Sequence, residues 1–170
     1  FEAAEAAGDF QTAAQDYLRM AAEYRESNPQ RYLGYQNLAQ EAYIKAGQYQ
    51  NAIDILMQLA ADRTDKAEVY ALNFKAWGLA DSLMQDQAQT QRIKDSFIAR
   101  YPNSLEAFNL HLLAIEPLKN DPQTKLLAAQ KYLELYDRAK QNTIETGGTT
   151  ADEIYLWAIS IYINENQVEE

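Results

Sequence analysis

The sequence contains no cysteine, a single histidine (His111), four prolines and six glycines in 170 residues. Without cysteine the chain cannot form disulfides, thiolate metal sites, iron–sulfur clusters or a thiol nucleophile. A single histidine also excludes a multi-histidine metal site. Basic residues are few, 15 against 25 acidic ones, which gives a formal net charge of −10. This balance argues against a nucleic-acid partner, because binding to phosphates requires clustered Lys and Arg.

Motifs for catalysis or cofactor binding are missing as well. The sequence has no GxGxxG or GxxxxGK phosphate loop, no GxSxG nucleophile motif and no EF-hand calcium loop. His111 lies in an apolar segment without a carboxylate three or four positions away, which favours a packed histidine over a general base or ligand. We therefore expect a non-enzymatic protein without cofactor or metal ion.

The sequence leaves the compartment open. Residues 1–10 lack the basic region and apolar core of a signal peptide, and the longest apolar run, 154–163, is about half the length of a membrane span. The chain starts at Phe1 rather than Met, so we interpret it as a piece of a longer protein. A chain without cysteine is compatible with both the bacterial periplasm or envelope and the cytoplasm.

Ala and Leu are abundant and Val occurs only twice, which favours helix over sheet. Residues suited to capping helix N-termini recur along the chain, among them Asp9, Asn28 before Pro29, Asp65, Asn103, Asp121 before Pro122, and Thr150. Pro117 is expected to end or kink a helix near Glu116. These signals predict helices over 1–7, 9–26, 29–46, 49–62, 65–85, 88–100, 103–118, 122–142 and 150–165, with a Gly-containing loop at 142–149.

Two segments share one pattern. Residues 8–17 (GDFQTAAQDY) and 47–56 (GQYQNAIDIL) both have Gly, a polar residue, an aromatic, two polar residues and Ala, 39 positions apart. A fixed period in a helical chain is typical of a solenoid. The pattern resembles the tetratricopeptide repeat (TPR) family, which implies a right-handed α-α superhelix of about four antiparallel helix pairs. In the second repeat, the signature spacings of that family fall on Ala39, Tyr43, Gly47, Tyr49, Ala52 and Leu56.

The resemblance implies a single helical-repeat domain over 1–170, with repeats near 1–28, 29–64, 65–102 and 103–142 and an extra helix at 150–165. The motif is clearest over 1–62, whereas the third repeat lacks the turn glycine. The segment Tyr101–Ser104 (YPNS) is similar to the joint between helices in TPR-like bacterial envelope proteins.

The family resemblance also implies a groove lined by the first helix of each pair. By spacing, its lining would include Asn37, Glu41 and Ile44 from the second repeat and Lys75, Gly78 and Ser82 from the third. Tyr32 and Tyr35 are the tyrosines expected to be most exposed, and Tyr35 is a candidate partner-binding residue. Glu41 stands where some TPR proteins use Asn to hold a peptide carboxylate, so that mode of binding is not supported.

In the segment 154–163 (IYLWAISIYI) only Ser160 is polar, so we expect this helix to need cover on more than one side. Ile154, Trp157 and Ile161 are the candidate packing residues. The expected cover is a following helix or a neighbouring molecule. The alternatives are burial within this chain and a β-prone stretch.

The sequence therefore predicts an interaction or scaffold module that holds a neutral, apolar or basic protein or peptide in a helical groove, without a nucleic-acid partner or a membrane span. The alternative is a structural assembly segment of a bacterial envelope protein, which packs on other domains or self-associates and has no groove ligand.

Overall fold

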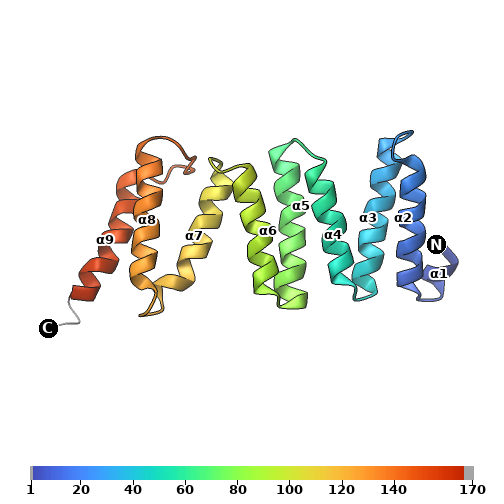
Figure 1. Cartoon of the computed structure of the whole chain (residues 1–170), viewed down its shortest axis with the longest axis horizontal. Coiled ribbons are helices and arrows are strands. Elements are labelled where there is room, and N and C mark those ends of the chain that lie inside the picture. The colour runs from blue at the N-terminus through green and yellow to red at the C-terminus, as the bar shows by residue number, and fades with distance from the viewer. Residues whose placement is uncertain (1, 167–170) are drawn as a thin grey trace. The chain divides into compact units, whose positions relative to one another are not determined.

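The computed structural model describes residues 2–166 of the chain. The protein is 79% helix, and the described residues contain no strand, so the all-α prediction is confirmed. Nine α-helices follow one another within the described range, with a π-helical segment, η1, after the fifth (Figure 1). They are α1 (Glu2–Ala6), α2 (Phe10–Tyr24), α3 (Pro29–Lys45), α4 (Tyr49–Ala61), α5 (Lys66–Gly78), η1 (Leu79–Met84), α6 (Gln87–Arg100), α7 (Leu105–Lys119), α8 (Lys125–Lys140) and α9 (Ala151–Asn166).

The packing contacts divide the chain into two compact units, Phe1–Asp95 and Ser96–Glu170. Within each unit, helices that are consecutive in sequence pack side by side and run antiparallel (Figure 1). The division falls inside α6 and inside the predicted repeat 65–102. Short connections favour this arrangement, because two helices joined by a few residues pack as antiparallel neighbours.

The predicted repeat has a matching backbone turn in the structure. Gly8 and Gly47, 39 positions apart, both have positive φ, 75° and 71°. At the first turn the N–H groups of Gly8 and Asp9 donate to the carbonyls of Glu5 and Ala4 at 3.0 and 2.8 Å. At the second, Gly47 and Gln48 donate to Ile44 and Tyr43 at the same two distances. Both turns therefore end their helices with one left-handed glycine, which satisfies the last carbonyls.

The core cluster that α2, α3 and α4 form in the first unit consists mainly of alanines and tyrosines. Its fully buried members include small residues where α2, α3 and α4 pack together, and two tyrosines fill the space between them: Ala13, Ala14, Ala39, Ala42, Ala52, Tyr17 and Tyr43. Small side chains let helix axes approach closely, and the rings fill the remaining gaps. Of the residues named for the repeat, Ala39, Tyr43 and Ala52 are thus core residues.

The core of the second unit uses larger side chains. Its buried cluster is formed by α7, α8, α9 and the loop before α9: Phe108, Ile115, Ala128, Tyr132, Leu135, Ile144, Ile154 and Ala158. The loop is held by its own contacts, since Ile144 is buried and the Glu145 N–H donates to the Asn103 carbonyl at 2.9 Å. The predicted loop at 142–149 therefore contributes one residue, Ile144, to the core.

Three helix-end predictions need correction. Ser104, not Asn103, caps α7, and its hydroxyl accepts from the Ala107 N–H at 3.2 Å. Residues 121–124 form a turn in which the Asp121 carboxylate accepts from the Gln123 N–H, so α8 begins at Lys125 rather than near 122. Pro117 does not end α7 near Glu116, because the helix continues to Lys119. Proline near a C-terminus removes a single helical hydrogen bond there, which this helix tolerates.

Candidate functional site

A groove in the first unit is lined by residues of α3, of the end of α4 with the turn after it, and of α5. The helices α3 and α5 run parallel to each other (Figure 1). The groove has a volume of about 260 Å³. Its floor and walls are mostly apolar, and three polar side chains complete the lining: Leu33, Leu59, Ala71 and Leu72, with Asn37, Arg63 and Glu68. This is the kind of concave surface, apolar with a few placed polar groups, that binds ligands.

The charged groups of this groove neutralise each other. Arg63 Nε lies 3.1 Å from Glu68 Oε2, and both side chains remain partly in solvent. The start of α5 beside them is fixed, because Asp65 accepts from the Glu68 N–H at 2.9 Å. Asn37 is exposed, and its amide can both donate to and accept from a peptide bond. The groove can therefore bind an uncharged backbone between apolar contacts.

The structure brings together only some of the predicted groove residues. Asn37 lines the groove. Glu41 is exposed one turn further along α3, and Lys75 is exposed one turn beyond Ala71 on α5, so both extend the same faces. Ser82 is exposed on η1 and does not line this groove. Ile44 packs partly against the core.

The tyrosines predicted to be exposed are partly buried. Tyr35 stacks on Tyr17 and on Tyr24 with ring centroids 6.4 and 5.8 Å apart. Tyr32 also packs against the core of the first unit. The prediction was wrong because α2 covers this side of α3, and rings at a helix interface gain more from stacking than from solvent. Tyr35 thus contributes to the α2–α3 contact.

A second groove lies in the second unit, between α7 and α9 over α8. It holds about 290 Å³ and contains two of the three predicted C-terminal packing residues, Trp157 and Ile161. The other lining residues are Leu112, Glu116, Lys119, Tyr132 and Ser160. The third predicted packing residue, Ile154, is completely buried in the core of its own unit.

This groove also carries an ion pair. Lys119 Nζ lies 2.6 Å from Glu116 Oε2, and this bond raises the pKa of Lys119 above its ordinary value. Burial raises the pKa of the Tyr132 hydroxyl. The rings of Tyr132 and Trp157 pack edge to face, with their centroids 5.6 Å apart. Both groups remain in their usual protonation state at neutral pH, so the groove has a neutral, aromatic lining.

The helix α9 has an exposed apolar face on the side opposite its buried residues. Tyr155, Leu156 and Ile163 are 42%, 62% and 51% exposed, whereas Ile154 and Ala158 are completely buried. The three exposed residues follow i, i+1, i+8 spacing and so share one face. Sequence reasoning missed them because it treated the helix as uniformly apolar, although the helical period of residues 154–163 separates the two faces.

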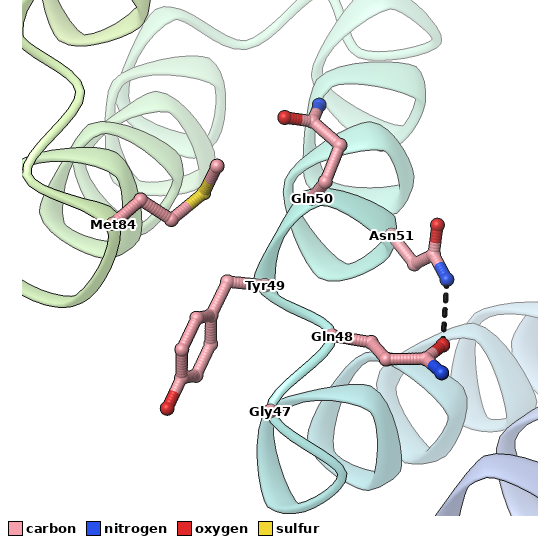
Figure 2. Close-up of a pocket in the computed structure, with 6 residues that line it drawn as sticks. All are labelled: Gly47, Gln48, Tyr49, Gln50, Asn51 and Met84. Atoms are coloured by element: carbon pink, nitrogen blue, oxygen red, sulfur yellow. Dashed lines mark hydrogen bonds between the residues drawn. The ribbon is translucent and has the colours of Figure 1, made fainter.

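A further depression, also missed from the sequence, lies at the turn between α3 and α4 (Figure 2). It has a volume of about 350 Å³ and is lined by Gly47–Asn51 and by Met84 of η1. Figure 2 shows Tyr49 and Met84 projecting from different elements toward this space, while the Asn51 amide donates to Gln48 Oε1 at 2.8 Å. All side chains that line this depression are uncharged, so it can contact a ligand but offers no charged group to bind one.

Comparison with protein-family models finds no matching family, and comparisons with curated proteins and with solved structures find no match. The fold itself defines the class: an all-α protein whose described residues form nine helices packed in sequential pairs. None of the helices in the described part of the chain is long and apolar enough to cross a membrane. Between residues 2 and 166, no three acidic or histidine side chains gather as metal ligands would.

Proposed function

We propose that the chain is a TPR-like helical repeat that binds an extended peptide segment of a protein partner, without chemistry of its own, in the groove between α3 and α5. The observation that carries this proposal is the juxtaposition of the Asn37 amide and the Arg63–Glu68 pair around an apolar floor. An extended peptide offers backbone N–H and C=O groups for hydrogen bonds with the Asn37 amide, and alternating side chains that fill apolar space.

The repeated architecture supports this proposal. The same helix-ending turn occurs at Gly8 and Gly47. A groove of the same construction, between two parallel helices over the antiparallel helix that connects them, occurs in each unit. Helical repeats bind partners along surfaces built in this way from successive pairs.

The charges indicate the kind of peptide. Arg63 and Glu68 offset each other in the groove, Glu41 and Lys75 extend its two faces with opposite charges, and the chain as a whole carries a formal net charge of −10. A neutral or basic peptide with apolar side chains therefore fits better than an acidic one, because a carboxylate beside Glu41 would be repelled.

A peptide selection tests this function. Peptides of twelve residues are selected by display against the wild-type protein, and their affinities are measured by fluorescence anisotropy. Ala71→Trp fills the groove and should weaken binding by at least tenfold, since the peptide can no longer reach the floor. Ala67→Trp is the matched control, because Ala67 is exposed on α5 outside the groove. Equal binding to both variants would contradict the proposal.

The exposed face of α9 favours a second candidate function, a structural assembly segment that packs on other domains or self-associates. Leu156 and Ile163 are more than half exposed among the described residues, and Tyr155 beside them is 42% exposed although its ring packs on Tyr136. Sedimentation velocity at micromolar concentration tests it. Self-association through this face predicts an oligomer that Leu156→Glu converts to a monomer, whereas a groove-binding monomer shows no change.

A further inference from the structure

A small cavity in the second unit lies between α7 and α8, outside both grooves. Its volume is about 120 Å³. Ile115 and Leu135 are buried at its floor, and the rest of the lining is Ala114 and four side chains that carry or can carry charge: His111, Lys131, Glu134 and Arg138. This space is far below the roughly 300–1,000 Å³ of a drug-sized ligand but is sufficient for one small polar group with a short alkyl portion.

Arg138 is held rigidly at this cavity. Its Nη2 donates to the Pro102 carbonyl at 2.6 Å and to Asn103 Oδ1 at 3.4 Å. Its Nη1 lies 3.4 Å from His111 Nε2, which accepts because a guanidinium has no acceptor. These three bonds leave two of the five guanidinium N–H donors for a ligand. The orientation of the group is therefore fixed before anything binds.

The cavity has the opposite charge balance to the chain. Lys131 and Arg138 are seven residues apart on α8 and line the same face, with Glu134 between them. Among the described residues, neither Lys131 nor Glu134 has a hydrogen-bond or ion-pair partner. Two cations and an imidazole thus face one carboxylate, in a chain whose formal net charge is −10.

We propose that this cavity binds a carboxylate group, with Arg138 and Lys131 as the charged donors and Ile115 and Leu135 in contact with the adjoining methyl or methylene. One of the remaining Arg138 N–H groups and the Lys131 ammonium can each donate to an oxygen of one carboxylate. Glu134 disfavours a doubly charged phosphate, since repulsion grows with charge. This inference does not depend on the peptide groove in the first unit.

The single histidine makes the test direct, because the His111 imidazole protons are the only ones of their kind in the NMR spectrum. Acetate is titrated against chloride at constant pH and ionic strength. We expect the His111 signal to move and saturate with a dissociation constant on the order of 1–10 mM, as suits a ligand of four non-hydrogen atoms.

Three variants separate this site from a nonspecific effect. Lys131→Met should weaken acetate binding about 3–10-fold and Glu134→Gln should strengthen it by a similar factor, the effect of one charge at roughly 4 Å in a hydrated site. Lys140→Met is the matched control, because Lys140 bonds to the Tyr136 hydroxyl on the side of α8 that faces Asp152 of α9. It should leave binding unchanged. The gain expected in Glu134→Gln cannot arise from misfolding.

A His111 signal that does not saturate, or that responds equally to chloride and acetate, would overturn the proposal, as would equal losses in Lys131→Met and Lys140→Met. The source of the carboxylate is tested with N-acetyl-trialanine. If its free acid binds at least as tightly as acetate, the ligand is the carboxylate of a peptide; if only acetate binds, it is a small acid. Both results support the site, whereas binding of the C-terminally amidated peptide contradicts it.

Discussion

The two units build the same groove from different cores. In the first unit the crossing residues are alanines, among them Ala39, Ala42 and Ala52, and the groove above them is lined by aliphatic residues and an amide. In the second, Phe108, Ile115 and Ile154 fill the core, and the groove is lined by Trp157 and Tyr132. A groove between alternate helices therefore follows from sequential antiparallel packing and does not require the small residues of the repeat pattern.

The comparison also shows that the residues that determine the helix spacing differ from those that line the grooves. Small residues determine how closely the helices of the first unit approach. In both units the ion pair at the groove, Arg63–Glu68 or Lys119–Glu116, comes from residues outside the core clusters. The lining can thus diverge between units while the backbone arrangement stays the same.

The largest expected effect tests the core of the second unit. Phe108→Ala should lower the free energy of unfolding by about 3–5 kcal/mol, because it leaves a cavity in a core of large side chains. Each unit contains one tryptophan, Trp77 or Trp157. Urea unfolding followed in single-tryptophan variants should show the larger loss through Trp157. Equal losses at both tryptophans would mean that the two units unfold together and would weaken the comparison.

The first unit should be sensitive to added side-chain volume, because its crossings are built from alanines. Ala52→Leu should cost about 1–3 kcal/mol, because the added isopropyl group overpacks a completely buried crossing. Ala61→Leu, at an exposed position on the same helix, should change stability by less than about 0.5 kcal/mol. Thermal unfolding by circular dichroism measures both. A similar small effect at the two positions would show that the helices do not cross at Ala52.

A smaller difference is expected between two turn glycines, one in each unit. Gly47 and Gly147 both have positive φ, 71° and 62°, so alanine should cost each about 1 kcal/mol. At Gly147 a Cβ would also lie 2.8 Å from Leu105 Cδ1, whereas at Gly47 nothing lies within 4 Å. Gly147→Ala should therefore destabilise more than Gly47→Ala in urea unfolding. Equal losses would show that Leu105 moves aside freely.

The smallest effect concerns two exposed helix caps. Bonds from the Thr12 hydroxyl and N–H lower the pKa of Asp9 below 3.8, and bonds from Thr150 lower the pKa of Glu153 below 4.5. Because both folded-state pKa values are depressed, the stability from these caps is present above the unfolded-state values and is lost as the pH falls through the folded-state ones. Asp9→Asn keeps a capping oxygen without a charge, so its urea midpoint should fall less between pH 5 and about pH 3. An unchanged pH dependence in Asp9→Asn would contradict the assigned cause.

The sequence predicted the helices well, because caps and periodicity are local signals. Asp9, Asn28, Asp65 and Thr150 all cap the predicted helices. The wrong predictions concern side chains whose exposure depends on a neighbouring helix. The side of α3 that carries Tyr35 is covered by α2, which no spacing within α3 reveals.

The candidate sites were less predictable for the same reason. Asn37 was found because the family spacing places it on the groove face of α3. Arg63 and Glu68 were not, since they approach each other only when the loop between α4 and α5 closes. The pairing of His111 with Arg138, 27 residues away, likewise depends on the antiparallel packing of α7 against α8.

The most direct test of the central proposal is to map a selected peptide on the protein by amide chemical shifts. The account predicts that the perturbed amides cluster around the α3–α5 groove, at Leu33, Asn37, Arg63 and Ala71, and that α9 stays unchanged. Perturbations that cluster instead at Tyr155, Leu156 and Ile163 would contradict a groove-binding function and would favour assembly through α9.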